Sequence, residues 1–457
     1  MNNMKNKILP IAIAVIVGVF VMVGCQTKTR QTSNVPEPNN QLQEDSLLNL
    51  VQYQTFQYFW DGAEANSGMA CERIHLDGKY PQNDEHIVTL GGSGFGVMAL
   101  LVGIERGFVS RSEVLARMQQ IVDFLGKADR FHGAWPHWLD GQTGKVRPFG
   151  KKDNGGDLVE TAFMIQGLLT VAEYFEGGNE AEQQLVKDIH QLWEEVEWDW
   201  YTKGGEDVLY WHWSPEYEWD MNFPVGGYNE CLIMYVLAAS SPTHGIKPAV
   251  YDKGWAKSGA IANDTVYYGL STVLNYYEHN NDPIGPLFWA HYSYLGLNPK
   301  GLKDKYADYW QLTTNHALIH YKYCVDNPYG YKGYGSDQWG LTSSYSMRGY
   351  AGHHPGKSDL GVISPTAALS SFPYTPKESM QFLKYLYTEA DSLVGKYGPY
   401  DAYSHTDNWY LPRYLAIDQG PIPVMIENYR SGLLWNLFMK NADVQKGLKK
   451  LGFTISK

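Results

Sequence analysis

The stretch GDLVETAFMIQGLLTVAEYF, residues 156–175, is apolar on nearly every side of the helix that its periodicity predicts. A helix that is hydrophobic all round is buried, because it has no polar face to turn toward water. Two further stretches share this character and also begin at glycine-rich turns: GGSGFGVMALLVGIER at 91–106 and GGYNECLIMYVLAA at 226–239. We therefore expect these helices to form the inside of the fold.

Other predicted helices are amphipathic and rich in charge, such as Arg111–Asp129, with Ser110 as its expected N-cap, and Glu180–Trp200. Buried helices that alternate with half-exposed ones indicate an inner and an outer ring, an all-α toroid. An irregular helical array is the alternative. We count eleven or twelve helical segments in the sequence from Ser46 onward and find no domain boundary there, so residues 46–457 are predicted to be one domain.

The N-terminus has the pattern of an export signal. Lys5 and Lys7 precede an uncharged run from Ile8 to Gly24, which is short for a membrane span. The run ends in VMVGC, which resembles a bacterial lipobox and would make Cys25 a lipidated first residue. An uncleaved signal anchor is the alternative.

Residues 25–45 are rich in Pro, Asn and Gln and are predicted to be a disordered tether. With residues 1–24 as a signal peptide, the protein is expected in the cell envelope, held by a lipid anchor only. Gln26 is compatible with sorting to the outer membrane, facing the periplasm.

The composition limits the classes of function. Charged residues make up 19% of the chain and the mean hydropathy is -0.37, as in a soluble globular domain. Without the two lysines of the leader, 35 basic residues stand against 49 acidic ones, a net charge of about -14. Nucleic acids and polyanionic glycans need cationic clefts, so neither is an expected partner.

No cofactor or metal site is predicted. After Cys25 only Cys71, Cys231 and Cys324 remain, without metal-binding spacing. The adjacent pair His353-His354 lies on a glycine-rich loop, where neighbouring histidines rarely chelate one ion. The sequence also lacks a GxSxG elbow and nucleotide-binding glycine loops.

Three carboxylates crowd the start of the 156–175 helix, in DNGGDLVETAF at 153–163. Asp157 as N-cap and Glu160 at N3 would form a capping box. Asp153, Asp157 and Glu160 would equally suit sugar hydrolysis, which needs clustered carboxyl groups of different proton affinity. Both interpretations are compatible, because capping can position the carboxylates for chemistry.

Aromatic residues accompany acidic ones in the loops before the inner helices. Aromatics make up 14% of the chain, with 34 Tyr and 15 Trp, and sugar-binding proteins stack such rings against sugar faces. A cleft for neutral sugars is therefore expected at this end of the helices. The candidate stacking residues are Trp135, Trp138, Trp211, Trp213 and Trp219.

Five motifs together resemble the bacterial glycoamylase-like domain, and more specifically glycoside hydrolase family 144. They are GAWPHWLDGQTG (133–144), DNGGDLVETAF (153–163), PVGGYNE (224–230), PLFWAHYSYLG (286–296) and YLAIDQGPIPVMIENYRSGLLW (414–435). The resemblance covers the chain from about Leu47 onward. It implies an (α/α)6 barrel and inverting cleavage of linear β-1,2-glucan to sophorose or short sophoro-oligosaccharides.

The resemblance also implies site residues: Asp153, Asp157, Glu160, Glu230 and Asp418. Glu230 is our candidate general acid, because it lies between a polar turn and an apolar run whose burial would raise its pKa. The base stays open among the three aspartates. The pKa values of Asp157 and Glu160 are expected to be depressed by the helix start.

Outside the carboxylates, Arg430 is expected to pair with an internal carboxylate such as Glu427, with a substrate contact as the alternative. Other functions stay open as well: a glucoamylase-like α-1,4-glucan hydrolase, a polysaccharide lyase, or a lipoprotein that only binds glycans. The sequence does not decide between endo and exo cleavage.

Overall fold

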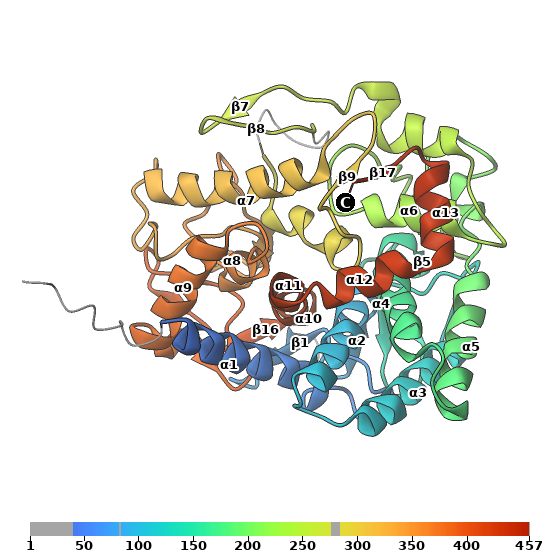
Figure 1. The fold of residues 1–457 in the computed structure, drawn as a ribbon, viewed down its shortest axis with the longest axis horizontal. Helices are drawn as coiled ribbons and strands as arrows, with labels where there is room; N and C mark the ends of the chain where they lie inside the picture. The colour runs from blue at the N-terminus through green and yellow to red at the C-terminus, as the bar shows by residue number, and fades with distance from the viewer. Residues whose placement is uncertain (1–39, 82–83, 276–283, 457) are drawn as a thin grey trace, which may run out of the picture. The chain divides into compact units, whose positions relative to one another are not determined.

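The computed structural model describes residues 40–81, 84–275 and 284–456 (Figure 1). The predicted signal peptide, Cys25 and most of the predicted tether lie outside the described residues. Residues Leu42–Lys457 form one compact unit, which contains α1 from Leu42 on and every later helix and strand of the described residues.

The described chain is rich in helices. The α-helices are α1 (Asn40–Trp60), α2 (Leu90–Glu105), α3 (Arg111–Lys127), α4 (Leu158–Phe175), α5 (Glu180–Glu194), α6 (Leu232–Ser240), α7 (Tyr309–Asp326), α8 (Pro365–Ser370), α9 (Pro376–Thr388), α10 (Ala416–Gln419), α11 (Pro421–Arg430), α12 (Leu433–Lys440) and α13 (Ala442–Lys450). Shorter 3₁₀ turns include η5 (Leu287–Ala290) and η6 (Tyr292–Tyr294).

The connections contain short antiparallel strands that the all-α prediction did not include. The pairs are β1 (Arg73–His75) with β16 (Arg413–Leu415), β5 (Gly156–Asp157) with β6 (His212–Trp213), β7 (Val266–Tyr267) with β8 (Leu270–Ser271), β9 (Leu302–Lys303) with β17 (Thr454–Ile455), β10 (Ser343–Ser344) with β11 (Ala351–Gly352), β12 (Val394–Gly395) with β13 (Gly398–Pro399), and β14 (Tyr403–Ser404) with β15 (Trp409–Tyr410); β2 (Ile87–Thr89), β3 (Trp138–Asp140) and β4 (Val146–Arg147) form a three-stranded sheet. Each strand has only two or three residues, so these ladders fix loops at the helix ends rather than build a sheet layer.

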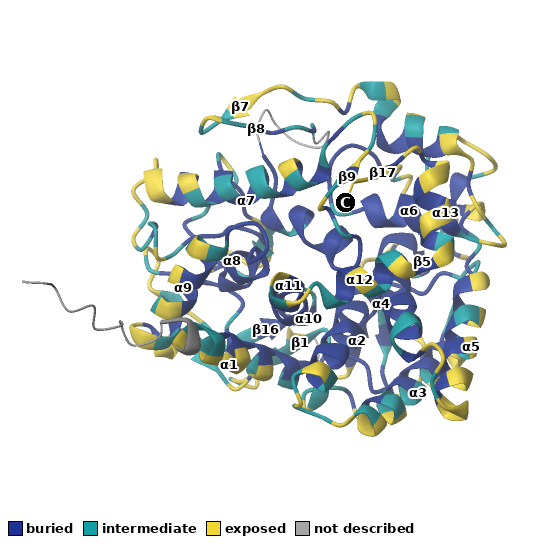
Figure 2. Ribbon diagram, in the orientation of Figure 1, coloured by how far each residue is buried: buried dark blue, intermediate teal, exposed yellow. Residues whose placement is uncertain are grey.

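The helices form two kinds, as the hydrophobic pattern predicted. Nearly every residue of α2, α4, α6, α8 and α11 is buried, whereas α3, α5 and α9 bury one face (Figure 2). Helix α4 is long and apolar enough to cross a membrane, but 89% of it is buried inside the fold. Its hydrophobicity therefore serves the core.

Helices α2 and α4 pack against each other at very close range. A Cβ atom built on Gly94 would lie 2.4 Å from the carbonyl oxygen of Phe163, and one on Gly167 would lie 2.2 Å from the carbonyl oxygen of Gly94. Since such distances exclude any side chain, glycine at these positions permits backbone-to-backbone contact. The glycines of the predicted inner helices thus serve packing as well as the turns.

The helix ends follow local capping chemistry in several places. Ser110 and Glu113 form a complete capping box at the start of α3, which confirms the predicted cap. Asn179 and Glu182 do the same for α5. These reciprocal bonds satisfy backbone N–H groups that the first helical turn leaves without partners.

Several predicted boundaries were wrong. Helix α1 begins at Asn40, inside the predicted tether, because Gln, Leu and Glu are good helix formers. Helix α6 begins only at Leu232, so the residues from Gly226 to Cys231 belong to the preceding turn. The C-terminal run is divided into α10, α11 and α12 at Pro421 and at Gly432, which adopts φ 74°.

Candidate active site

A cavity of about 350 Å³ lies where the first turns of α2, α4 and α10 meet the turn before α6. This is the end of the buried helices where the cleft was expected. Its charged and titratable lining consists of Glu72, Arg73, His137, Glu160, Glu230, Tyr292, Tyr345 and Tyr350. Its further aromatic lining consists of Trp138, Phe149, Phe163, Trp211 and Phe288.

Asp157 is the N-cap of α4, as predicted, and its side chain is fully buried. One oxygen accepts hydrogen bonds from the N–H groups of Val159 (3.0 Å) and Glu160 (2.9 Å), and the other lies 3.0 Å from Nδ1 of His137. Burial alone raises the pKa of Asp157, but the hydrogen bond and charge of His137, with the charge of His212, outweigh it and lower that pKa. Asp157 is thus held ionised beneath the cavity.

Glu160 does not close the predicted capping box. The N–H of Asp157 donates to the carbonyl of Trp135 instead, at 2.9 Å. Oε2 of Glu160 accepts a 2.7 Å hydrogen bond from the N–H of Gly91, at the start of α2. The side chain of Glu160 therefore points across to the neighbouring helix, where it lines the cavity.

The proton affinity of Glu160 also differs from the prediction. Burial, and the nearby charges of Asp157 and Asp153, raise the pKa of Glu160 to about 7, although His137 opposes this. The helix-start effect, which predicted a depressed pKa, is smaller than the combined cost of burial and carboxylate crowding. The pKa values of the neighbouring carboxyls Asp157 and Glu160 are thus pushed apart.

His137, which the sequence analysis did not single out, connects this group. Its Nδ1 bonds to Asp157, and its Nε2 lies 4.0 Å from Glu160. Burial lowers the pKa of His137, but the charges of Glu160, Asp157 and Asp153 outweigh burial and raise that pKa to about 10. His137 is therefore a cation that balances part of the carboxylate charge.

Asp153 lies beside this group but is not among the cavity-lining residues. Its Oδ2 is 3.5 Å from Nε2 of His212, which is also 3.8 Å from Asp157. Ligand atoms of His137, Asp153 and Asp157 lie within 4.8 Å of one another, a spacing that a cation could use. The cationic ring of His137 supplies positive charge at the same place, and the absence of a catalytic metal stays a prediction.

Glu230 lines the cavity from the turn before α6 and is half-buried. Because α6 begins at Leu232, Glu230 lies before the first turn of that helix. The hydroxyl of Ser293 donates to the carbonyl oxygen of Glu230, which fixes this turn against η6.

Asp418 is buried in α10 beside the cavity rather than in its lining. The hydroxyl of Tyr292, a lining residue, donates to Oδ1 of Asp418 at 3.0 Å. Burial, followed by the charge of Asp401, raises the pKa of Asp418 well above its usual range. Asp418 thus reaches the cavity through Tyr292.

Glu72 and Arg73 form a lining ion pair that the sequence analysis missed. Asp84 adds a second carboxylate 3.3 Å from Nε of Arg73. The pair lies at the start of β1, which is held by pairing with β16, more than 300 residues later in the chain. No local motif marks such a pairing.

The predicted aromatic platforms separate into two groups. Trp138 and Trp211 line the cavity. Trp135 was wrongly predicted to bind substrate: its ring is fully buried and its indole N–H donates to the carbonyl of Leu125 at 3.1 Å. Trp213 and Trp219 are partly buried against the core and are absent from the cavity lining, because their loop folds back beside β5.

An aromatic residue outside the prediction takes a more suitable place. Phe149 is 53% exposed at the cavity, with its ring stacked on His137 at 4.2 Å between centroids and edge-to-face with Trp138 at 4.8 Å. An exposed ring beside carboxyl groups is suited to pack against a sugar face.

Arg430 is not among the cavity-lining residues and does not pair with Glu427 as predicted. Its Nη1 donates to the side-chain oxygens of Asn49 (2.7 Å) and Gln52 (2.6 Å) on α1. Glu427 is bound instead by Arg106, through two hydrogen bonds of 2.6 and 2.7 Å. The predicted pairing failed because α2 brings Arg106 to Glu427 from more than 300 residues away.

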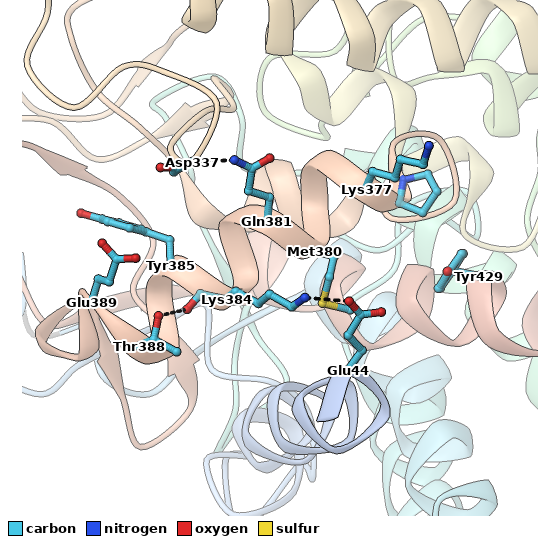
Figure 3. A pocket seen from close by; sticks show the side chains of 11 residues that line it. Glu44, Asp337, Lys377, Met380, Gln381, Lys384, Tyr385, Thr388, Glu389 and Tyr429 are labelled. Carbon is cyan, nitrogen blue, oxygen red and sulfur yellow. Dashed lines mark hydrogen bonds and ion pairs between the residues drawn. The ribbon is translucent and has the colours of Figure 1, made fainter. Parts of the chain in front are cut away.

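A larger hollow, of about 630 Å³, lies over α9 and does not contain the predicted carboxylates (Figure 3). Two of its three acidic lining residues are engaged with neighbours: Glu44 with Lys384 at 2.7 Å, and Asp337 with Gln381. Trp219 lines another surface hollow of about 900 Å³. The smaller cavity, with its cluster of carboxyls and aromatic walls, is therefore the candidate site.

Comparison with known proteins gives consistent matches. Residues 222–442 match the family model described as "Glycoamylase: Putative glucoamylase". A curated relative from Parabacteroides distasonis, an "exo beta-1,2-glucooligosaccharide sophorohydrolase (non-reducing end)", is 44% identical over 429 residues, which is 89% of this chain and 58% of the relative. The chain thus spans little more than half the length of that relative.

Solved structures extend the comparison. An endo-β-1,2-glucanase from Chitinophaga pinensis, with sophorotriose and glucose, is 65% identical, with a TM-score of 0.88 over 90% of this chain and 98% of that one. An endo-β-1,2-glucanase from Talaromyces funiculosus, with β-1,2-glucan, is 11% identical, with a TM-score of 0.61 over 88% and 90% of the chains, a likeness of fold alone.

The fold places carboxyl groups between aromatic side chains at the N-terminal ends of buried helices. Together with these relatives, this arrangement defines the class of the protein as glycoside hydrolases. Within that class, the chain belongs to glycoside hydrolase family 144, the bacterial glycoamylase-like family, as the motifs at 133–144, 153–163, 224–230, 286–296 and 414–435 predicted.

Proposed function

We propose that the protein hydrolyses linear β-1,2-glucan to sophorose or short sophoro-oligosaccharides, with inversion at the anomeric carbon. The observation that carries this proposal is the cavity in which Glu160 and Glu230 face an aromatic wall that includes Trp138 and Phe149. The family members from Parabacteroides distasonis and Chitinophaga pinensis, which cleave β-1,2-linked glucose, support the choice of linkage. The net charge of the chain favours a neutral glucan over an anionic one.

Inverting hydrolysis needs an acid for the leaving oxygen and a base for the attacking water. Glu230 is the proposed acid, supported by its half-buried place in the lining. Asp418 is the proposed base and acts through Tyr292: the water gives a proton to the phenol oxygen while the phenol passes its own proton to Asp418. Glu160, held by Gly91, binds a sugar hydroxyl, and Asp157 and Asp153 keep His137 charged beside it.

The arrangement of buried and half-exposed helices supports an (α/α)6 toroid as the architecture. We further propose that Cys25 is lipidated after removal of residues 1–24 and that the enzyme faces the periplasm from the outer membrane. Mass spectrometry of the mature N-terminus would test the anchor, since lipidation adds a defined mass to Cys25.

The function is tested with soluble protein that begins after Cys25, incubated with linear β-1,2-glucan and, separately, with starch. Sophoro-oligosaccharides from the first substrate alone would support the proposal, and a ladder of sizes would indicate endo action while one size would indicate exo action. NMR of the first products reads the anomeric configuration. Glucose from starch alone, or retention of configuration, would overturn the corresponding part of the proposal.

The acid assignment has its own test, because a good leaving group does not need protonation. Glu230→Gln should lose on the order of 10³-fold on β-1,2-glucan and recover most of that loss on an aryl sophoroside with an acidic phenol. Glu160→Gln is the matched variant and should show no such recovery. Recovery in Glu160→Gln alone would make Glu160 the acid, which its pKa near 7 would permit.

A further inference from the structure

Asp418 has a buried acidic neighbour that none of the sequence motifs contains. Asp401 lies between β13 and β14 and is 1% exposed, and Asp418 is 4% exposed. The N–H of Tyr345 donates to Oδ2 of Asp401 at 3.0 Å, and the hydroxyl of Tyr292 donates to Oδ1 of Asp418 at 3.0 Å. Tyr345 and Tyr292 both line the cavity.

The second oxygen of each carboxyl group lacks such a donor. Oδ1 of Asp401 and Oδ2 of Asp418 are buried and receive no hydrogen bond from any N–H or hydroxyl of the described residues. The two carboxyl groups lie within hydrogen-bonding reach of each other. Because an ionised carboxylate has no hydrogen to donate, a hydrogen bond between them requires one proton.

The surroundings favour a single charge on this pair. The titratable groups that face it are Glu72, which adds negative charge, and the neutral hydroxyls of Tyr292 and Tyr350. The charge of Asp401 also acts on the phenol of Tyr345, together with the charges of Arg73 and Arg413, whose guanidinium groups are paired with Glu72 and Asp77. Burial raises the pKa of Asp401 to about 7, and like charges at contact distance cannot both persist without a cation.

We propose that Asp401 is a positioning residue whose carboxyl shares one proton with Asp418, so that the pair carries one negative charge and Asp418 keeps an oxygen aimed at the hydroxyl of Tyr292. This rests on the proposed function, in which Asp418 acts through Tyr292. The shared proton satisfies the inner oxygens, and the remaining negative charge leaves the pair able to accept one further proton through Tyr292. The pair then holds two protons until the product leaves and one returns to water.

The decisive variants are Asp401→Asn and Asp401→Ala. The amide of Asn can donate to Asp418 in place of the shared proton, so Asp401→Asn should keep kcat/KM on β-1,2-glucan within about tenfold of the original enzyme. Alanine removes the donor, and Asp401→Ala should fall on the order of 10²-fold further. Asp359→Asn is the matched control, because Asp359 is a buried aspartate bound by two tyrosine hydroxyls away from the cavity, and it should leave kcat/KM unchanged.

The pH profile separates this role from a merely structural one. In Asp401→Asn the acid limb of kcat/KM should move to lower pH, because the amide hydrogen bond favours ionised Asp418. In Asp401→Ala it should lie at higher pH than in Asp401→Asn, because buried Asp418 then has no donor. Equal loss in both variants with no movement of the limb would overturn the proposal.

Infrared difference spectra give a readout that does not depend on turnover. At the pH of the assays, the original protein should show the carbonyl band of a buried protonated carboxyl group that is missing in both Asp401→Asn and Asp418→Asn. If neither variant removes such a band, the shared proton does not exist. If the protein shows the band but does not cleave β-1,2-glucan, the proposed function is wrong while the shared proton between Asp401 and Asp418 is supported.

Discussion

The carboxylate of Glu160, in the first turn of α4, accepts a 2.7 Å hydrogen bond from the backbone N–H of Gly91, in the first turn of α2. The bond joins the starts of the two most closely packed buried helices. It fixes one carboxyl oxygen of Glu160 against the backbone of α2. The position of Glu160 therefore depends on a residue that has no side chain of its own.

Gly91→Ala should impair the site more than the fold. The added Cβ would lie 2.5 Å from Oε2 of Glu160, so the carboxylate must move. A displacement near 1 Å typically costs on the order of 10²-fold in rate. Gly126→Ala is the control, because a Cβ there meets nothing within 4 Å, and it should leave kcat/KM unchanged. Equal kcat/KM in the two variants would contradict the role given to this hydrogen bond.

Truncation of Trp135 should mainly lower stability, whereas truncation of Trp138 should mainly weaken substrate binding. Trp135→Ala removes a fully buried ring and should lower the free energy of unfolding by about 3–5 kcal/mol. Trp138→Ala removes a lining ring and should raise KM about tenfold with a small change in stability. Urea unfolding and steady-state kinetics on both variants would test this, and a Trp138 variant with unchanged KM would remove Trp138 from the binding surface.

Acid should destabilise the fold through a buried histidine group. Burial lowers the pKa of His316 to about 4 and that of His291 to about 3. His316 accepts from Tyr228 and donates to the carbonyl of Gly285, as only a neutral ring can. Its contribution to stability is complete above the unfolded pKa near 6.5 and is lost as pH falls toward the folded value.

His316→Asn isolates this effect, because other titrations cancel in the comparison with the original protein. Between about pH 7.5 and about pH 5 the original should lose about 2 kcal/mol of unfolding free energy relative to the variant. His86→Asn, at an exposed position, should show no such difference. Parallel pH dependence in the original and the His316 variant would show that His316 is not held neutral.

Arg106 and Arg430 lie near each other but should contribute very different amounts to the free energy of unfolding. Arg106→Ala leaves the buried carboxylate of Glu427 without its cation and should cost about 3–5 kcal/mol of unfolding free energy. Arg430→Ala loses hydrogen bonds near the surface and should cost under about 1 kcal/mol with unchanged KM. A raised KM in Arg430→Ala would restore the substrate contact that the sequence left open.

The sequence predicted the buried helices well, because a helix that is apolar on every side is stable only when the rest of the fold surrounds it. It predicted helix starts where a local cap decides them, as at Ser110 and Asp157. It failed where a break depends on distant packing, as at the late start of α6 and the division of the C-terminal run. Short strand pairs escaped notice, since two-residue strands have no periodicity to detect.

In the site, motifs identified Glu160 and Glu230 as functional candidates but not their surroundings. His137 stands inside the motif GAWPHWLDGQTG at 133–144, but nothing in that motif indicates its contact with Asp157, 20 residues later. Glu72 and Asp401 had no local signal, because contacts with other segments set their positions: β1, next to Glu72, pairs with β16, and the N–H of Asp401 donates to the carbonyl of Arg413 in β16. Their chemistry became visible only with burial and distance.

The contact of Gly94 with α4 has a consequence for how this enzyme can diversify. Two helices that touch backbone to backbone cannot slide or rotate against each other when side chains change elsewhere. The carboxyl groups at the first turn of α4 are therefore held by a helix pair whose geometry stays the same as the rest of the sequence changes during evolution. New product lengths or linkages must then arise from the walls, at residues such as Phe149 and Tyr350 on the connecting loops, and a library built to retune the enzyme would gain most from those positions.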